Sequence, residues 1–306
     1  MSTQTTISAV GFCTPTGNGN FSTLEGAIRT IADLGADAAE LSLYGEEIIS
    51  GGRLIRHRVE QLVGITRQFD LRYTVHGQIV SNFMDREHLE YQKAVVRAML
   101  ELCNNVEAGV LVHHSGKAPM PAPSRLPVLD QMERDALAEM GEVAEGYGVR
   151  IALENIFAVS DDEYRQTPAQ VAETVRAVNS RNVCGLIDFS HAYIECTRLG
   201  LNWREHIRAM APVTGHLHIH DSFGRPYGTT KFYHPAEATA LGIGDLHLPI
   251  GWGDIPWEDI FDELTFLPDT ILIMEIGENR FSTEQPDCLA RARGLAERVN
   301  NRLLAA

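Results

Sequence analysis

The sequence predicts a single α/β domain folded as a closed (β/α)8 TIM barrel. Eight short apolar segments alternate with longer amphipathic segments along the 306 residues, as expected for parallel strands joined by helices. Each strand–helix pair takes roughly 35–40 residues, which favours a closed barrel over an open doubly wound sheet. The stretch GFCTPTGNGN lacks GxGxxG spacing, which disfavours a dinucleotide-binding fold. No linker divides the chain, so residues 1–306 are expected to form one domain.

The strand positions follow from short apolar, β-branched runs, and the helices from amphipathic runs between them. Strands are expected at residues 6–12, 38–43, 71–76, 109–114, 149–154, 183–188, 214–220 and 270–275. Helices are expected at residues 22–34, 54–69, 86–104, 127–146, 167–178, 202–210, 257–264 and 283–304. In the fifth helix Thr167 is a suitable N-cap and Pro168 a suitable first residue. Residues 221–256 exceed ordinary loop length, so we expect a lid there.

Composition and charge narrow the choice of partner and compartment. The net charge of −15 opposes binding to a polyanion, so nucleic acid is disfavoured and a small-molecule substrate is expected. No apolar run is long enough to span a bilayer, and the N-terminus lacks a signal-peptide pattern. The five cysteines are scattered and not in CxxC spacing, which predicts a reduced, cytoplasmic protein.

Nearly all of the predicted strands end in residues that bind metals. In such barrels the functional groups gather at the carboxyl ends of the strands. These ends carry Glu40, His76, His113, His114, Glu154, Asp188, His216, His218, His220 and Glu275. Burying a carboxylate or imidazole without a partner costs several kcal/mol of folding free energy, so a cation shared by these side chains would stabilise them. Histidine and carboxylate without thiolate suit Zn²⁺, Mn²⁺ or Fe²⁺.

Strand periodicity distinguishes among these histidines. Alternate residues of a strand face the same side, so His216, His218 and His220 share one face. We expect His216, one step deeper, to be a structural residue, and His220, one step nearer the mouth, to contact substrate or to support the metal ligands. Adjacent residues face opposite sides, so of His113 and His114 only one points inward.

The ordered motifs AAELSL, LVHHSG, IALEN, GLIDFSHAY, HLHIHDSFG, DLHLPIGWGDIPW and ILIMEI resemble the xylose isomerase-like TIM-barrel superfamily. This superfamily includes sugar isomerases and epimerases and the endonuclease IV type of abasic-site nuclease. In the isomerase branch the resemblance implies one divalent metal, with ligands at Glu154, Asp188, His218 and Glu275. In the nuclease branch it implies three zinc ions and five further ligands, which match His76, His114, His191, Asp245 and His247. The match LVHHSG favours His114 over His113.

The resemblance and the acidic charge favour a divalent-metal-dependent isomerase or epimerase acting on a small sugar or sugar-like polyhydroxy or keto compound. The metal would stabilise an enediolate as a Lewis acid. Glu154 and Glu275 would transfer protons on opposite faces of the substrate, with His191 as a third catalytic residue. The expected substrate-binding residues are Glu40, His220, Arg225 and Trp252.

Two alternatives stay open at this stage. The complete set of nine ligands suits a three-metal phosphoesterase that cleaves a small phosphoester. Abasic-site DNA is a weaker candidate, because the stretch GQIVSN after His76 has no aromatic wedge. A non-catalytic metal-holding barrel is the third reading. The number of ions, from one to three, and the oligomeric state are not fixed by the sequence.

Overall fold

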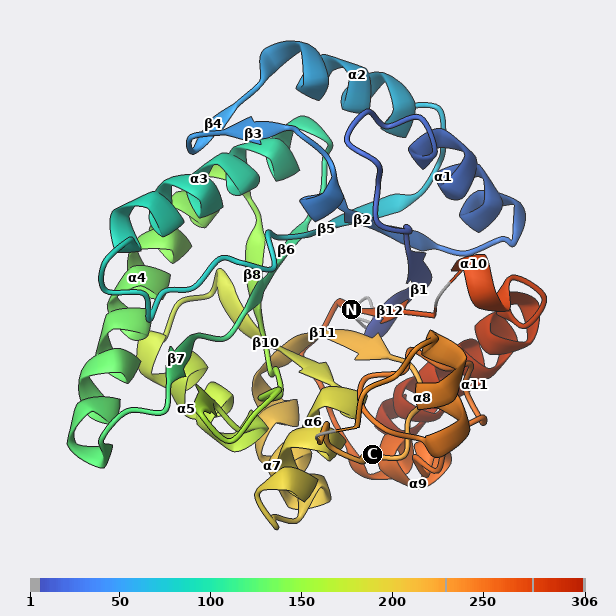
Figure 1. The fold of residues 1–306 in the computed structure, drawn as a ribbon. Coiled ribbons are helices and arrows are strands. Elements are labelled where there is room, and N and C mark those ends of the chain that lie inside the picture. The colour runs from blue at the N-terminus through green and yellow to red at the C-terminus, as the bar shows by residue number, and fades with distance from the viewer. Residues whose placement is uncertain (1–5, 229, 277, 305–306) are drawn as a thin grey trace.

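The computed structural model describes residues 6–228, 230–276 and 278–304. Eight parallel strands close into a barrel with helices around it, which confirms the predicted TIM barrel (Figure 1). Around the barrel the strand order is β1-β12-β11-β10-β8-β6-β5-β2. The bounds of these strands are β1 Ile7–Cys13, β2 Ala38–Ser42, β5 Arg72–His76, β6 Val110–His114, β8 Arg150–Glu154, β10 Val183–Asp188, β11 Thr214–Ile219 and β12 Thr270–Met274.

All eight expected helices are present, and their ends lie within three residues of the expected ones. They are α1 Leu24–Asp33, α2 Arg56–Thr66, α3 Leu89–Asn105, α4 Leu126–Tyr147, α5 Pro168–Val178, α7 Trp203–Met210, α9 Trp257–Glu263 and α11 Gln285–Leu304. Thr167 and Gln170 form a capping box at the start of α5, with Pro168 as its first residue. Within the described ranges, no helix has the length and apolar character needed to cross a membrane.

Three helices and two small sheets were not expected. The helices are α6 Phe189–Arg198, α8 Pro235–Leu241 and α10 Glu278–Phe281. One small sheet pairs β3 Ile49–Ser50 with β4 Arg53–Leu54, and the other pairs β7 Lys117–Pro119 with β9 Glu163–Arg165. Single 3₁₀ turns are η1 Leu43–Gly45, η2 Pro123–Arg125 and η3 Ala211–Val213.

The core has two parts because each barrel strand has an outer and an inner face. Outward side chains such as Leu217 and Ile219 pack with the helices in one large apolar cluster. A separate cluster contains inward residues from earlier positions in the strands, among them Ala9, Val110 and Ile271. Burying each Leu or Ile contributes about 1.5–3 kcal/mol. Toward the carboxyl ends, the inward positions become polar.

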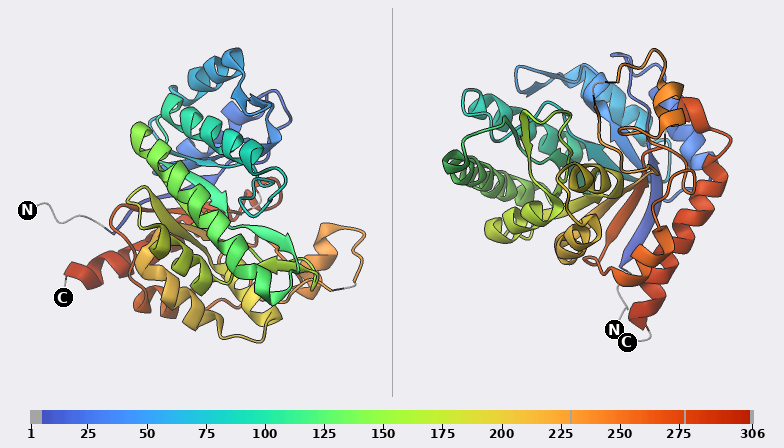
Figure 2. Two further views of the ribbon diagram at one scale, coloured as in Figure 1. Left: turned by 90° about the vertical axis from the view of Figure 1, so that its left-hand side faces the viewer. Right: turned by 60° about the horizontal axis from the view of Figure 1, so that its bottom comes forward.

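The segment 221–256 follows β11 and carries α8, which projects from the barrel in Figure 2. Its base is anchored by the buried carboxylate of Asp221, which accepts hydrogen bonds from the backbone N–H groups of Gly251 (2.7 Å) and Ser222 (3.0 Å). A Cβ atom at Gly253 would lie only 2.4 Å from an oxygen of Asp221. The glycine therefore allows the loop to close over this carboxylate.

Candidate metal centre

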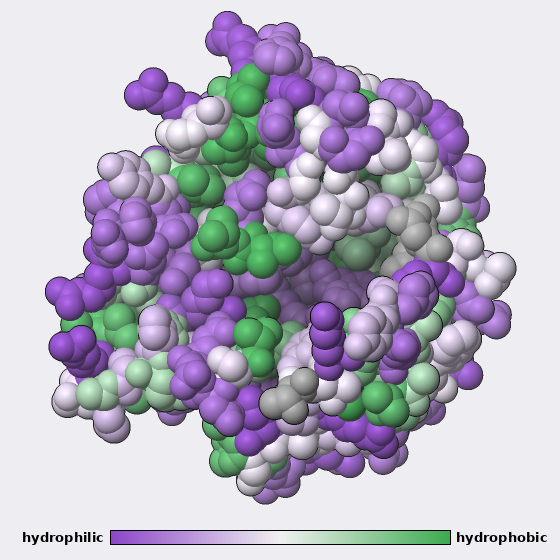
Figure 3. All heavy atoms as spheres, viewed as in Figure 1, coloured by the Kyte–Doolittle hydropathy of each residue, from purple (hydrophilic) through white to green (hydrophobic). Residues whose placement is uncertain are grey.

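The carboxyl ends of the barrel strands open on the face that carries segment 221–256. Figure 3 shows this face hollowed at its centre, with hydrophilic side chains deep in the hollow. The strand register brings residues from neighbouring strands together here, because His114 is paired with Glu154 and Asp188 with His218. Seven of the nine sequence-predicted ligands lie at or just beyond these strand ends, and the other two, Asp245 and His247, lie in segment 221–256.

His218 lies at the middle of the group and has no exposed surface. Its Nδ1 is 3.5 Å from Oε1 of Glu154 and 3.5 Å from Oε1 of Glu275. Asp188 is also fully buried, at the end of the neighbouring strand β10. These four residues are the set predicted to hold a single divalent ion.

A second group lies on the β5–β6 side of Glu154. Nε2 of His114 is 3.4 Å from Oε2 of Glu154, and Nε2 of His76 is 3.8 Å from the same oxygen. The rings of His76 and His114 meet edge to face, with centroids 5.1 Å apart. His113 points away and packs on Phe83, as strand alternation predicts. The inward ring of the HH pair is therefore His114.

A third group lies on the opposite side, where segment 221–256 returns to the barrel. Oδ2 of Asp245 is 3.4 Å from Nε2 of His191 and 2.9 Å from Nε2 of His247. His247 adopts the left-handed conformation, with φ of 48°, which costs a non-glycine residue about 1 kcal/mol or more. Nδ1 of His191 lies 3.2 Å from Oε1 of Glu154, which links this group to the centre.

The spacing of these atoms fits a divalent ion with nitrogen and oxygen ligands. Around a tetrahedral ion with ~2.1 Å bonds, neighbouring ligand atoms lie about 3.4 Å apart. The contacts of His218 and His114 with Glu154, and of His191 with Asp245, fall at 3.4–3.5 Å. Among the described residues, Oε2 of Glu154 and Nδ1 of His218 are buried and make no hydrogen bond. Such atoms are costly unless a cation satisfies them.

The electrostatics of the site also favour a cation. Burial opposes ionisation of Glu154, yet His114 and His218 hold the pKa of its carboxyl well below the ordinary value. Burial likewise opposes ionisation of Asp245, and His247 lowers the pKa of that carboxyl. Burial lowers the pKa of His247, but Asp245 raises it to about 10. The carboxylates are thus ionised near neutral pH and attract protons or a metal ion.

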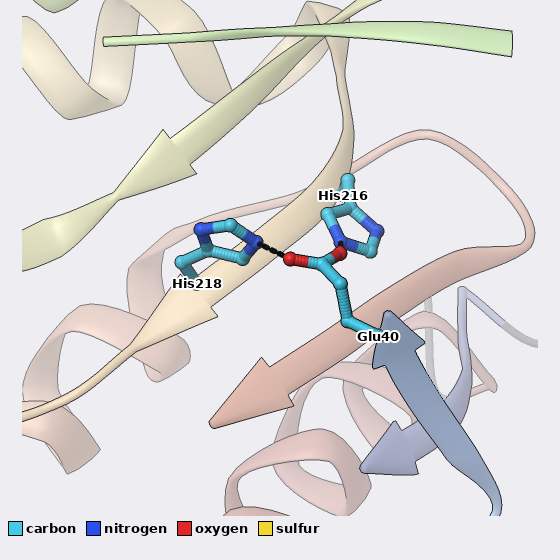
Figure 4. A group of neighbouring side chains, drawn as sticks. All are labelled: Glu40, His216 and His218. Atoms are coloured by element: carbon cyan, nitrogen blue, oxygen red, sulfur yellow. Dashed lines mark hydrogen bonds and ion pairs between the residues drawn. The ribbon is translucent and has the colours of Figure 1, made fainter. Parts of the chain in front are cut away.

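Glu40 does not reach the mouth, contrary to the expectation that it binds substrate. It has no exposed surface, and its carboxylate lies between His216 and His218 (Figure 4). Glu40 is the third residue of β2, in register with Thr74, whereas Ser42 aligns with His76 at the rim. One inward layer therefore separates Glu40 from the mouth. His216 lies at this deeper level, as expected.

His220 is expected to touch substrate but has no exposed surface. Its Nε2 is 3.0 Å from Oδ2 of Asp188 and 3.7 Å from Oδ1 of Asp245. Its ring stacks on that of His247, with centroids 4.2 Å apart. The structure therefore places His220 behind the predicted ligands, where it supports them, and not in a position to bind substrate.

Arg225 and Trp252, the other expected substrate-binding residues, make their described contacts within the segments after β11 and β12. Nη1 of Arg225 donates to the carbonyl of Leu241, and its guanidinium lies over the ring of Phe223. Trp252 packs edge to face on Phe281 and is half exposed. Both side chains thus contact segments around the mouth, and their role in substrate binding stays a prediction.

A pocket of about 330 Å³ opens beside Glu275 and His247. The residues lining it are Cys13, Thr14, Pro15, Thr16, Ser42, Tyr44, His247, Glu275, Ile276 and Arg280. The hydroxyl-bearing side chains of this pocket lie at or just after the ends of β1 and β2. The sequence analysis did not predict them, because it considered only residue types that bind metals. Tyr44 also contacts the ring of His76, with centroids 5.5 Å apart. Functional groups of such barrels gather at the carboxyl ends of the strands, and this signal would have predicted the hydroxyl-lined side of the pocket as well as the metal ligands.

Several known proteins are similar to this chain in sequence or in structure. The uncharacterised protein MJ1311 of Methanocaldococcus jannaschii is 22% identical over 248 residues, which cover 79% of this chain and 74% of that protein. A D-tagatose 3-epimerase-like protein has a TM-score of 0.72 at 21% identity, covering 97% of this chain and 100% of its own. A D-psicose 3-epimerase studied in the presence of D-fructose has a TM-score of 0.68 at 14% identity, covering 94% and 99%.

A further solved structure, an IOLI protein with a bound zinc atom, has a TM-score of 0.68 at 17% identity and covers 96% of this chain and 99% of its own. The family model described as xylose isomerase-like TIM barrel matches residues 28–296. That span begins in α1 and ends in α11, so it includes seven of the eight barrel strands and all nine predicted ligands. The chain therefore belongs to the xylose isomerase-like TIM barrel family.

Proposed function

We propose that this protein is a divalent-metal-dependent isomerase or epimerase that acts on a small sugar or sugar-like polyhydroxy or keto compound. One observation carries the proposal. Glu154 and Glu275 each place a carboxylate oxygen 3.5 Å from the same nitrogen of His218, beside a pocket lined by hydroxyl groups. Moving a proton from a carbon needs two such groups close to a site that stabilises negative charge.

A divalent ion held by Glu154, Asp188, His218 and Glu275 would act as a Lewis acid toward negative charge on substrate oxygens. Glu275 lines the pocket, so we assign it the proton transfer on the pocket side. Glu154 is 1% exposed, and we assign it the second transfer. His191 contacts Glu154 through Nδ1 and would keep that carboxylate oriented.

The pocket supports a small polar substrate. Its volume of about 330 Å³ lies in the range of small-molecule sites. The hydroxyls of Thr14, Ser42 and Tyr44 match the hydrogen-bonding groups of a sugar. Similar solved structures include proteins named D-psicose 3-epimerase and D-tagatose 3-epimerase-like protein, which supports the same substrate class.

A second candidate is a three-metal hydrolase of a small phosphoester. Two further histidine pairs favour it. On one side of His218, the carboxylate of Glu154 lies near His76 and His114. On the other side, the carboxylate of Asp245 lies near His191 and His247. Sites with several metals suit attack on phosphorus. The net charge of −15 favours a small phosphoester over nucleic acid within this alternative.

Deuterium exchange tests the proposed reaction across a whole class of sugars at once. The protein, loaded with Mn²⁺ or Zn²⁺, is incubated in D2O with a panel of ketoses and aldoses and followed by proton NMR. An isomerase or epimerase that returns a solvent proton incorporates deuterium at the reacting carbon. No exchange with any sugar of the panel, together with phosphate release from a small phosphoester, would reject the proposal in favour of the hydrolase.

A further inference from the structure

A buried carboxylate lies directly beneath the candidate metal centre, and three side chains contact it. Oε2 of Glu40 accepts hydrogen bonds from Oγ1 of Thr74 (2.8 Å) and Nε2 of His216 (2.8 Å). Its other oxygen, Oε1, is 2.8 Å from Nε2 of His218. All four side chains are fully buried. Figure 4 shows the carboxylate of Glu40 between the two imidazole rings.

The contacts of Glu40 with His216 and His218 connect two strands that are not neighbours in the barrel. β2 is not a neighbour of β11, because β1 and β12 lie between them in the barrel. Glu40 therefore reaches over two strands to His216 and His218. Thr74, on the adjacent strand β5, is in register with Glu40 and fixes its carboxylate from the side.

Glu40, His216 and His218 have the composition of a metal site, but the distances between their nitrogens and oxygens are shorter than those between two ligands of one ion. Each imidazole nitrogen is 2.8 Å from its carboxylate oxygen, whereas ligand atoms around one ion lie about 3.4 Å apart. On its other side, the His218 ring faces Glu154 and Glu275 at 3.5 Å. The ring thus has one nitrogen in close contact with a carboxylate oxygen and one nitrogen at the spacing of a metal ligand.

This asymmetry determines which nitrogen of His218 is available. A neutral imidazole has one N–H donor and one bare nitrogen, and the group that accepts the N–H selects between the two forms. The carboxylate oxygen of Glu40 lies 2.8 Å from Nε2, so a neutral His218 ring carries its proton on that side, which leaves Nδ1 bare toward Glu154 and Glu275. We propose that Glu40, held in place by His216 and Thr74, is a positioning residue that fixes His218 for metal binding through Nδ1.

The inference deepens the proposed function and rests on its metal centre, but not on the reaction assigned to it. The test compares Glu40→Gln with Glu133→Gln, the same change at another carboxylate without exposed surface. Glu133 accepts from the backbone N–H of Gly116, and none of its described hydrogen bonds or ion pairs involves a ring of the cluster. A glutamine at position 40 cannot accept on both sides, so it cannot hold His216 and His218 in their present forms together.

The first readout is zinc affinity, measured by competition with a chromophoric chelator. Glu40→Gln is expected to weaken the binding about 10–100-fold, and Glu133→Gln is expected to leave it unchanged. The second readout is the visible absorption spectrum of the Co²⁺-loaded protein, which reports ligand geometry. We expect it to change in Glu40→Gln alone. Long-range proton–nitrogen NMR of the zinc-loaded wild-type protein should place the His218 proton on Nε2, and a proton on Nδ1 would overturn the inference.

Wild-type zinc affinity and an unchanged Co²⁺ spectrum in a folded Glu40→Gln protein would overturn the inference. Loss of one ion, with the other ions bound at wild-type affinity, would also overturn it, because the cluster would then be a metal site itself. If Glu40→Gln does not fold, Thr74→Val gives the same test. It removes one donor to Glu40 at nearly constant shape, and affinity equal to that of the wild type would refute the role.

The two proposals fail in different ways. Absence of deuterium exchange with every sugar would reject the isomerase or epimerase, while a loss of zinc affinity in Glu40→Gln would still support the positioning role. Exchange activity in the wild type, with zinc affinity unchanged by Glu40→Gln, would support the isomerase or epimerase and reject the positioning role.

Discussion

Asp188 joins the metal centre to the start of a helix through His191. It is the last residue of β10 and the N-cap of α6, and its Oδ1 accepts a hydrogen bond from the backbone N–H of His191 at 2.7 Å. Its other oxygen lies 3.0 Å from Nε2 of His220. One carboxylate thus ends a strand, begins a helix and fixes the position of a second predicted ligand.

Replacing Asp188 with asparagine should separate these roles. Asparagine caps helices about as well as aspartate, so the unfolding free energy of metal-free Asp188→Asn should stay within about 1 kcal/mol of the wild type. Metal affinity should fall at least about tenfold, because a charged ligand is lost. Urea unfolding in the presence of a chelator and zinc competition check the two parts. Asp188→Ala is the control that loses both functions, with a further cost of about 1 kcal/mol for the cap.

The sequence was sufficient to predict the barrel fold and the grouping of the predicted metal ligands at the carboxyl ends of its strands. Parallel strands bring their carboxyl ends to one rim, so locating the apolar runs also located Glu154, Asp188 and His218 near one another. Alternation showed that only one of His113 and His114 points inward, the family resemblance favoured His114, and the structure has the two rings on opposite sides. The barrel and the alternation depend on strand periodicity, which is a local property of the chain, whereas the choice of His114 depended on the resemblance.

Depth within the barrel and the path of the long loop could not be predicted in this way. Glu40 lies two residues before the end of β2. Two residues of a strand correspond to one inward-facing layer of the barrel, so this small difference separates a position at the rim from a position below it. Arg225 follows Gly224, which has a φ of 59°, and pairs with Ile243 across the loop. Its direction depends on contacts between distant parts of the loop, which carry no periodic signal. Helix α6 was missed because it begins directly after β10 without a turn.

Glu275→Gln should lower the rate of deuterium exchange and leave the fold of the protein intact. Glu275 lines the pocket and is 9% exposed, and an amide of the same shape fits the same space. Removing a proton-transfer group costs about 10²–10⁴-fold in rate. Deuterium exchange at saturating Mn²⁺ or Zn²⁺ measures this loss, and circular dichroism serves as the control for folding. Exchange within a few-fold of the wild type would remove Glu275 from the mechanism.

His76→Ala and Asp245→Ala distinguish the two candidate functions. In a single-metal isomerase, neither residue belongs to the set of Glu154, Asp188, His218 and Glu275. The exchange rate should then stay within about tenfold of the wild type, the lower effect expected for outer groups. Elemental analysis should find about one ion per chain in the wild type. Loss of activity in both variants, with about three ions in the wild type, would favour the phosphoesterase.

Stability should depend on pH through Glu133, which lies outside the metal centre. Burial raises the pKa of this carboxyl to about 7, and its Oε2 is buried without a hydrogen bond in the described part of the chain. The folded state therefore holds a proton that the unfolded state releases near pH 4.5. By linkage, the contribution of Glu133 to stability falls as the pH rises from 4.5 to 7, by about 3 kcal/mol at most.

Glu133→Gln should remove this dependence, because glutamine carries no proton to lose and its oxygen can still accept from the N–H of Gly116, as Oε1 does now. The variant should be more stable than the wild type at pH 8 and nearly equal to it at pH 4.5. Urea unfolding of the metal-free proteins across this range is the measurement, since chelation removes the competing effect of metal binding at the mouth. If the stabilities of the two proteins run parallel from pH 4.5 to 8, Glu133 is ionised in the folded state and the assigned pKa is wrong.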